Sequence, residues 1–368
     1  MRRILTQARK ELIQIFRDRL ALTLALVLPL CILFMLGTTL ALTVHDVPLV
    51  VQDFDGSPAS RSLLDAFRSS LTFFVVPWST DRPPERAFNH NTARAVLIIP
   101  VHFGRDLARG KSTEVQLLVD GTDSNTAKLT QAYAGEVISY YNALQAGSAQ
   151  VAPVTAAVRH WYNPGRDSKK FYGPGIFVLG LSMFPPLLAA LAMSKEGEEN
   201  TILQVYVSSI SANEFLLGKI LAFMVISLLE WALSLAALLT YFGLHFAGDP
   251  TPFLVATVLY AFCVSAFGTL IGVAIPNQAA AIQAVALGGF LLIFLLSGLI
   301  FPVENVPAGL RWVSNIVWGR YYIEIVRDAL LQGGGWVAMW FRVLMIAIIG
   351  SVFYLIAWVK MRAMQLSI

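Results

Sequence analysis

The segment that comes nearest to a catalytic motif has Gly104 followed by Gly110, Lys111 and Ser112, residue types that occur in phosphate-binding loops. Those loops keep four residues between the two glycines, because their backbone N–H groups must close around the phosphate. Here five residues separate Gly104 from Gly110, and the segment follows a predicted helix rather than a strand. We interpret the match as a coincidence and expect any ATP to be bound by another chain.

Four aspartates could suggest a calcium site: Asp53, Asp55, Asp120 and Asp123. Calcium binds six to eight oxygens, and its best-known loop places glycine at the sixth position. The run Asp53-Phe54-Asp55-Gly56 lacks that spacing, so turns and helix caps explain the aspartates better. No HExxH, CxxC or GxSxG pattern occurs. The sequence therefore predicts no metal site and no catalytic residue.

Glu230 lies in the middle of a long apolar run, in the sequence Ser227-Leu-Leu-Glu230-Trp231. A charge at the centre of a membrane span costs about 2.5–3.5 kcal/mol or more, so it is usually neutral, paired or turned toward a wet cavity. Two interpretations stay open. Glu230 either lines a translocation path or a dimer seam, or it is a protonated carboxyl bonded to a neighbouring helix. Arg342, near the outer end of the last apolar run, can reach the membrane interface.

Long apolar runs must position these residues, since 56% of the 368 residues are hydrophobic and only 14% are charged. Soluble domains carry about 25% charged residues. A run of about 20 apolar residues crosses the hydrocarbon core as a helix, because only internal pairing satisfies its backbone in lipid. The sequence predicts a polytopic α-helical membrane protein with six transmembrane helices, near residues 20–43, 173–193, 216–241, 252–274, 279–300 and 337–359. The first run is too long for a signal peptide.

Lysine and arginine near the ends of the runs predict the orientation, since cytoplasmic loops are rich in both. One side carries ten: six in residues 1–19, then Lys195 and Lys219 after the second run, and Lys360 and Arg362 in the tail. In its short loops the opposite side carries only three, all between the fifth and sixth runs. The thirteen in residues 44–172 belong to a long folded segment, to which the rule does not apply. We expect both termini to be cytoplasmic, with residues 360–368 as a cytoplasmic tail.

Residues 1–19 predict an amphipathic interfacial helix, because apolar side chains recur at helical spacing and basic residues fill the other positions. Such a helix is either a topological anchor or a docking element for a partner, and the sequence leaves both open. No run of five or six like charges occurs, so nothing supports binding to nucleic acid.

Residues 44–172 predict an inserted extracytoplasmic α/β domain. Short runs rich in Val, Leu, Ile and Phe between turn residues predict strands at 47–52, 72–77, 94–100 and 114–120. Helical patterns follow at 57–69, 101–109 and 123–144, and Ser57 before Pro58 is a favourable helix start. Alternating strands and helices are typical of a small α/β layer structure.

Two connecting segments lie within residues 173–359, the part that holds helices 2–6. Residues 194–215 form a polar cytoplasmic loop, in which Asn213 could cap the third membrane helix. Residues 301–335 carry prolines and then large apolar residues at helical spacing. We expect one or two short helices there, partly re-entrant from the outer side.

Several segments together resemble the ABC-2-type transport permeases, in the drug-exporter-like branch with a large extracytoplasmic domain after the first helix. The resemblance covers essentially the whole chain. It is carried by Leu296-Ser-Gly-Leu-Ile-Phe-Pro-Val-Glu-Asn-Val-Pro307, Arg320-Tyr-Tyr-Ile-Glu324 with Arg327, Val119-Asp-Gly-Thr-Asp-Ser-Asn-Thr-Ala127 and Trp161-Tyr-Asn-Pro164. In the re-entrant segment it marks Ser297, Gly298, Pro302, Glu304, Arg320, Glu324 and Arg327.

The cytoplasmic loop is also similar to its counterpart in this family, which carries Glu-x-Gly-Thr and later Glu-x-x-x-Gly-Lys. Here the two elements read Glu199-Asn200-Thr201 and Glu214-Phe-Leu-Leu-Gly-Lys219. The chain departs from the family where Asn200 replaces the usual glycine, where Ser209 replaces a common proline, and where a basic patch is reduced to Pro276-Asn-Gln278. The resemblance implies that the ATPase-coupling residues are Glu196, Glu199, Thr201, Glu214, Gly218 and Lys219.

The resemblance implies a permease subunit of an ABC exporter, which is a transport subunit and not an enzyme. It would pair with a second permease copy or a paralogue in a bacterial inner membrane and bind two cytoplasmic ATP-binding-cassette ATPase subunits. This chain would hold no cofactor, because ATP and Mg would bind to the ATPase. Drugs or other amphipathic small molecules are the implied substrates, and a periplasmic adaptor protein is a further hypothesis.

Two other function classes remain as alternatives. An ion-coupled secondary transporter predicts an internal repeat and several carboxylates at membrane depth, of which only Glu230 is present. A membrane-anchored extracytoplasmic sensor needs a cytoplasmic output domain, and the predicted cytoplasmic segments are short for one.

Overall fold

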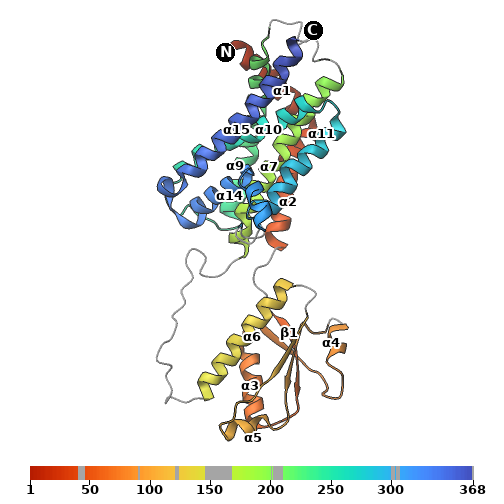
Figure 1. Cartoon of the computed structure of the whole chain (residues 1–368), viewed down its shortest axis with the longest axis vertical. Helices are drawn as coiled ribbons and strands as arrows, with labels where there is room; N and C mark the ends of the chain where they lie inside the picture. The colour runs from red at the N-terminus through yellow and green to blue at the C-terminus, as the bar shows by residue number, and fades with distance from the viewer. Residues whose placement is uncertain are drawn as a thin grey trace. The chain divides into compact units, whose positions relative to one another are not determined.

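The computed structural model describes residues 1–39, 46–89, 92–120, 124–145, 168–199, 201, 210–299, 303 and 307–366. The chain forms two compact units, Met1–Leu40 with His160–Ile368 and Ala41–Arg159 (Figure 1). Sequence features outside the described residues are Asp123, Trp161–Pro164, Asn200, Ser209, Pro302 and Glu304.

The first unit is helical, and its described residues include six helices long and apolar enough to cross a membrane. They are α2 (Arg19–Thr39), α7 (Ser168–Glu198), α9 (Ala212–Thr240), α10 (Thr251–Ala274), the segment Gln278–Leu296 and the apolar part of α15 (Gly335–Leu366). The helix α1 (Arg2–Arg17) precedes them, and its start lies at the same end of the unit as the end of α15 (Figure 1). We call this end the N-terminal face. The six helices confirm the predicted membrane fold class.

The fifth span is not a uniform α-helix. It runs from α11 (Gln278–Val285) through a π-helical turn, η2 (Ala286–Leu291), into α12 (Leu292–Leu296). Such π-helical turns are rare and often occur at functional sites. Hydropathy alone did not predict it, because a π-turn leaves the apolar composition of the helix unchanged.

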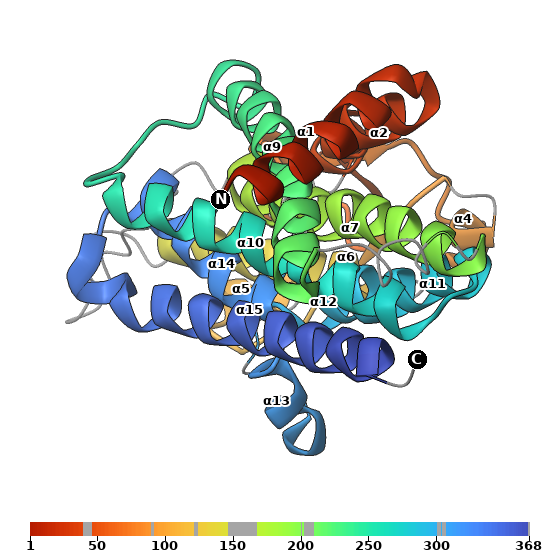
Figure 2. The ribbon, with the colours of Figure 1, turned by 90° about the horizontal axis from the view of Figure 1, so that it is seen from above.

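Helix α7 lies inside the bundle, with α2, α9, α10 and α11 around it (Figure 2). Glycine makes the closest of these approaches possible. A Cβ added to Gly268 of α10 would lie 2.2 Å from the carbonyl oxygen of Pro186 in α7. Because that oxygen belongs to the backbone, no side-chain rotation can relieve the overlap, and α7 and α10 must move apart.

We therefore expect Gly268→Ala to destabilise the membrane unit by about 1–3 kcal/mol, the usual cost of overpacking a dense interior. Thermal unfolding of the purified chain, followed by size-exclusion chromatography, measures this loss. Ser265→Ala is the matched control, since the Ser265 hydroxyl is buried without a hydrogen-bond partner among the described residues. A Gly268→Ala chain that unfolds together with the control would contradict the close helix contact.

The segment after the fifth span forms α13 (Ala308–Ser314), α14 (Trp318–Arg327) and the π-turn η4 (Asp328–Gln332). The short helices expected there are confirmed. Tyr322 of α14 stacks on Tyr260 of α10 with ring centroids 4.1 Å apart. Its hydroxyl lies 2.7 Å from that of Thr257, so α14 is anchored inside the helix bundle.

The described part of the second unit forms a four-stranded sheet with helices on both faces. Its strands are β1 (Val47–Asp53), β2 (Phe73–Val76), β3 (Ala95–Ile99) and β4 (Gln116–Val119), in the order β2-β1-β3-β4. β1 pairs parallel with β2 and β3, and β4 is antiparallel to β3. The four strands confirm the predicted α/β class.

Helices α3 (Pro58–Ser69), α5 (Phe103–Ala108) and α6 (Ser124–Gln145) pack on the sheet face that carries Leu49 and Leu97. The other face, with Val50 and Val96, packs against the short helix α4 (Glu85–Asn89). The sequence did not predict α4, because five residues are too few to show a helical period.

Turns and caps account for Asp53 and Asp55, as expected, whereas Asp120 forms an ion pair with Arg94 at 2.6 Å. Asp53 accepts hydrogen bonds from the N–H groups of Asp55 and Gly56 and from the hydroxyl of Ser60. Hydrogen bonds from Ser57 and from the Gly104 N–H lower the pKa of Asp55. Ser57 caps α3 as predicted. No group of His, Cys, Asp and Glu among the described residues could hold a metal ion.

Candidate functional site

The surface helix α1 packs directly on the start of α9. A Cβ added to Gly218 would lie 2.7 Å from Cβ of Gln7 and 3.1 Å from the carbonyl oxygen of Ile4. The face of α1 that turns inward buries Ala8, Glu11 and Ile15. Gly218, one of the expected coupling residues, therefore allows α1 to lie flat against a membrane helix.

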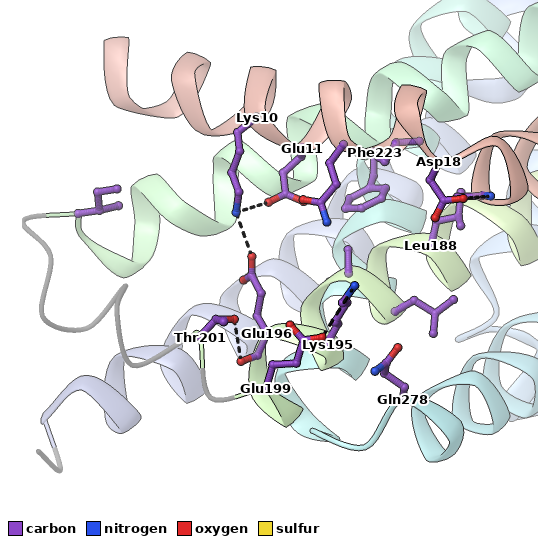
Figure 3. Close-up of a pocket in the computed structure, with 16 residues that line it drawn as sticks. Lys10, Glu11, Asp18, Leu188, Lys195, Glu196, Glu199, Thr201, Phe223 and Gln278 are labelled. Atoms are coloured by element: carbon purple, nitrogen blue, oxygen red, sulfur yellow. Dashed lines mark hydrogen bonds and ion pairs between the residues drawn. The ribbon is translucent and has the colours of Figure 1, made fainter.

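A network of buried charges fastens this contact. Lys219 is 0% exposed, and its Nζ lies 3.2 Å from Oε1 of Glu11 and 3.1 Å from Oε1 of Glu196. Nζ of Lys10 lies 3.5 Å and 3.4 Å from the same two oxygens (Figure 3). Because Glu196 belongs to α7, the network joins α1, α7 and α9 at one point.

The charges in this network compensate one another. Burial alone would lower the pKa of Lys10, but the carboxylates of Glu11 and Glu196 outweigh it and raise that pKa. Two lysines face two carboxylates, so the network has no net charge. The side chains of Lys219 and Glu11 are only 1% and 3% exposed, whereas that of Lys10 is 56% exposed. A buried ion pair of this kind is costly to break from one side, because the remaining charge stays desolvated.

Beside the network lies a cavity of about 620 Å³ between α1, the start of α2, the end of α7 and the start of α11 (Figure 3). Its apolar wall comes from Ile15, Ala21, Leu188, Leu191, Ala192, Ile210 and Phe223. Its polar wall comes from Lys10, Glu11, Gln14, Asp18, Lys195, Glu196, Glu199, Thr201 and Gln278. The expected coupling residues Glu196, Glu199 and Thr201 thus share one cavity with the surface helix.

The end of α7 is held locally. The hydroxyl of Thr201 donates to the carbonyl oxygen of Glu196 over 3.3 Å, and Lys195 lies 3.9 Å from Glu199. Glu198 accepts hydrogen bonds from the backbone N–H and the side-chain amide of Gln278. The bonds of Glu198 tie the beginning of the 194–215 loop to the first residue of α11.

The start of α9 corrects the expectation for Asn213. Ser211 caps the helix, and Glu214 completes a capping box by accepting from the Ser211 N–H. Asn213 lies two residues too far along the chain for this role and contacts the hydroxyl of Tyr354. Glu214 also lies 3.6 Å from Arg3 of α1, so this expected coupling residue has a structural role of its own.

Glu230 lies apart from this site. It is 1% exposed, and neither carboxylate oxygen has a hydrogen-bond partner among the described residues. A Cβ added to Gly180 would lie 3.2 Å from its Oε1 and 3.4 Å from Pro29, so the carboxyl fits where α2, α7 and α9 meet. Bonding to a neighbouring helix is therefore not seen in the described part of the chain.

The described motif residues between positions 297 and 327 form a second group, separate from the residues that line the cavity. Arg327 donates to the carbonyl oxygen of Gly298 over 3.0 Å, and Arg320 lies 3.3 Å from Glu324. Ser297 donates to the carbonyl oxygen of Ile293. Arg342 contacts Glu324 as well, so the expectation that it only reaches the interface missed this partner.

A family model described as "ABC-2 family transporter protein" matches residues 20–360. The chain belongs to this family. It is an integral membrane permease subunit, and family members of this kind lack an ATPase domain of their own. As an ABC permease it works with an ATPase partner, which binds the ATP.

Curated relatives of this ABC-2 permease extend over nearly its whole length. "Probable multidrug ABC transporter permease YbhR" of Escherichia coli (strain K12) is 27% identical over 96% of this chain and 97% of the relative. "Probable multidrug ABC transporter permease YbhS" of the same strain is 25% identical over 98% of this chain and 96% of the relative. "Inner membrane transport permease YhhJ" is 23% identical over 98% of this chain and 97% of the relative.

Two charged residues of the ABC-2 permease escaped the sequence analysis: Lys10 and Glu11. A weak signal existed, since Glu11 is the only acidic residue among the first 17 and falls on the inward face of an otherwise basic helix. Its partner Lys219 is 208 positions away, so no local pattern could have paired them.

Proposed function

We propose that this permease exports drugs or other amphipathic small molecules across a bacterial inner membrane, using ATP hydrolysed by two cytoplasmic ATPase subunits. The names of YbhR and YbhS support the substrate class, and the name of YhhJ supports the membrane. The excess of Lys and Arg on the N-terminal face supports cytoplasmic termini.

The observation that carries this proposal is the charge network of Glu11, Lys219 and Glu196. It connects α1 with the helices on both sides of the 194–215 loop. A force applied by an ATPase to the loop or to α1 would reach α7 and α9 together, because the three helices share one buried ion cluster. We infer that Glu196, Glu199, Thr201, Glu214, Gly218 and Lys219 couple the ATPase to the membrane helices.

The test is co-purification of the permease with its ATPase subunits, followed by ATP hydrolysis in nanodiscs. Glu199→Ala is the informative change, since this side chain is 53% exposed and its one ion pair within the described residues is a long contact with Lys195. We expect a stable permease that binds the ATPase weakly. The control is Glu114→Ala, an exposed change in the α/β unit. Failure of any ATPase to associate with the wild-type chain would refute the proposal.

We also propose that Glu230 contributes to the translocation path. An unpaired ionised carboxylate would be very costly in its buried place, so we infer that it carries a proton. Glu230→Gln keeps the shape and the neutral state. We expect the thermal stability to change by less than about 1 kcal/mol while substrate-stimulated ATP hydrolysis falls.

Melting and hydrolysis are measured on the same Glu230→Gln preparation. If substrate still stimulates ATP hydrolysis to the same extent, Glu230 contributes only to packing and not to transport. A large loss of stability would instead show that the carboxyl is ionised and paired in the folded protein.

The second permease in the complex is, on this proposal, an identical copy or a paralogue, and a periplasmic adaptor is a further partner to test. Native mass spectrometry of the chain purified alone distinguishes the first two: a homodimer is expected if copies pair with themselves. An adaptor would be identified by cross-linking from cysteines placed on the α/β unit in intact cells.

A further inference from the structure

We propose that the cavity beneath α1 binds amphiphiles that carry a primary ammonium head on an apolar body, taken up from the leaflet at the N-terminal face. The proposal deepens the proposed function by naming the chemistry of what enters. It rests on that function only for the export step that follows binding.

The size and place of the cavity fit such a molecule. Its volume of about 620 Å³ lies within the range of about 300–1,000 Å³ that is usual for small-molecule sites. Its walls come from the ends of membrane helices: Asp18 and Ala21 at the start of α2, Glu199 at the end of α7, and Gln278 at the start of α11. An amphiphile at the headgroup level would therefore meet it directly from the membrane.

The cavity has separate apolar and polar walls. Ile15, Leu188, Leu191, Ala192 and Phe223 offer a surface for an alkyl chain or ring system. The polar wall is formed by residues of α1 and of the last turns of α7, which face one another across the opening in Figure 3. A ligand that is apolar at one end and polar at the other satisfies both walls at once.

The charges select the sign of the head group. Three lysines lie in or just behind the polar wall, and each is already within 4 Å of a carboxylate. Lys10 lies 3.4 Å from Glu196, and Lys219 lies 3.1 Å from the same residue. Lys195 lies 3.9 Å from Glu199. Four carboxylates face these three lysines: Glu11, Asp18, Glu196 and Glu199. The site is thus short of one positive charge, and an ammonium head would supply it.

The hydrogen-bonding atoms of the polar wall also favour an ammonium head. Oε2 of Glu196 has no partner among the described residues, and because it is buried it accepts from a ligand only when the side chain turns toward the cavity. Asp18 uses Oδ1 for the Ala21 N–H. An ammonium head brings donors and no acceptors, which suits this wall. A sulfate or carboxylate head would bring acceptors and add to the negative charge.

Two sources share this chemistry: an exported amine and the ethanolamine head of a phospholipid. The probe is a twelve-carbon alkylamine with a diazirine in its chain, compared with its N-acetylated form, which has the same body without the charge. The purified permease in phosphatidylcholine nanodiscs, without ATPase, is irradiated with each probe. Labelled peptides are then identified by mass spectrometry.

We expect the amine to label the peptides of residues 12–21 and 188–195 about tenfold more than the acetylated probe, which corresponds to ~1.4 kcal/mol. Asp18→Asn should lower this ratio, since asparagine keeps the helix cap and removes the charge. Leu191→Trp should abolish labelling by filling the apolar wall. Glu114→Gln, in the α/β unit, is the control.

Equal labelling by both probes, or labelling spread over all membrane helices, would overturn the proposal. Nanodiscs that contain phosphatidylethanolamine distinguish the two sources. If this lipid reduces labelling by the amine probe, the lipid is the ligand; if labelling is undiminished, the ligand is a free amine. Both results agree with an ammonium site. Adding ATPase subunits and ATP separates this proposal from the proposed function. If the amine probe labels the cavity selectively but no ATPase associates, the binding site is supported and the proposed ATP-driven export is refuted.

Discussion

Replacing Lys219 by methionine is expected to destabilise the permease by about 3–5 kcal/mol, because removing one partner of a buried ion pair strands the other charge. Methionine fills nearly the same volume, so the loss is electrostatic and not a cavity effect. Glu11 is only 3% exposed and would then keep an ion pair with Lys10 at 3.5 Å and a hydrogen bond from the Gln7 amide at 3.0 Å. The measurement is thermal unfolding of the purified chain in detergent.

A compensated variant tests the cause. In Lys219→Met combined with Glu11→Gln, one positive and one negative charge are removed together, and we expect about half or more of the lost stability to return. Lys195→Met is the control, since its partner Glu199 is exposed and 3.9 Å away, and an exposed pair contributes about 0–1 kcal/mol. Equal melting of Lys219→Met and Lys195→Met would show that the buried network does not hold α1.

The membrane fold was predictable from the sequence because its cause is local. Each span is a continuous apolar run, and lipid leaves a helix as the only way to pair the backbone. The strands of the α/β unit were predictable for the same reason, since Val96 and Leu97 face opposite sides of a sheet buried on both faces.

The errors fall where the cause is not local. Ser211 and Asn213 are both good caps by residue type. Which of them begins α9 depends on where Glu214 can reach back to complete the capping box. Within the π-turn η2, a Cβ added to Gly289 would lie 3.1 Å from the carbonyl oxygen of Ser182, a close approach between helices that no pattern within residues 286–291 could show.

The candidate site was found only in part, for a related reason. Family resemblance marked Glu196 and Lys219 without saying that they touch. Glu11 carries no motif, and its role appears only when α1 is laid on α9. Ion pairs between residues about 200 positions apart depend on the tertiary fold. The sequence therefore indicated the residues around the α7–α9 loop, but not that they hold α1.

Gly218→Val is expected to uncouple ATP hydrolysis from transport. A Cβ at this position would overlap Cβ of Gln7 and approach the carbonyl oxygen of Ile4, so α1 as a whole must move away from α9. Overpacking of this kind costs about 1–3 kcal/mol, which the membrane unit should survive. The complex with its ATPase should still hydrolyse ATP, but substrate should no longer stimulate it, and vesicle transport should fall at least about tenfold.

The control for this change is Gly135→Val in α6, where a Cβ would meet nothing within 4 Å. Transport by Gly218→Val at the level of this control would contradict a coupling role for the α1–α9 contact. The double variant Gly218→Val with Lys219→Met is more decisive, because neighbouring changes that act through one movement are not additive. If both changes act by releasing α1, the double variant should transport no less than whichever single variant transports least. If the two losses of transport add, Lys219 has a second role besides holding α1.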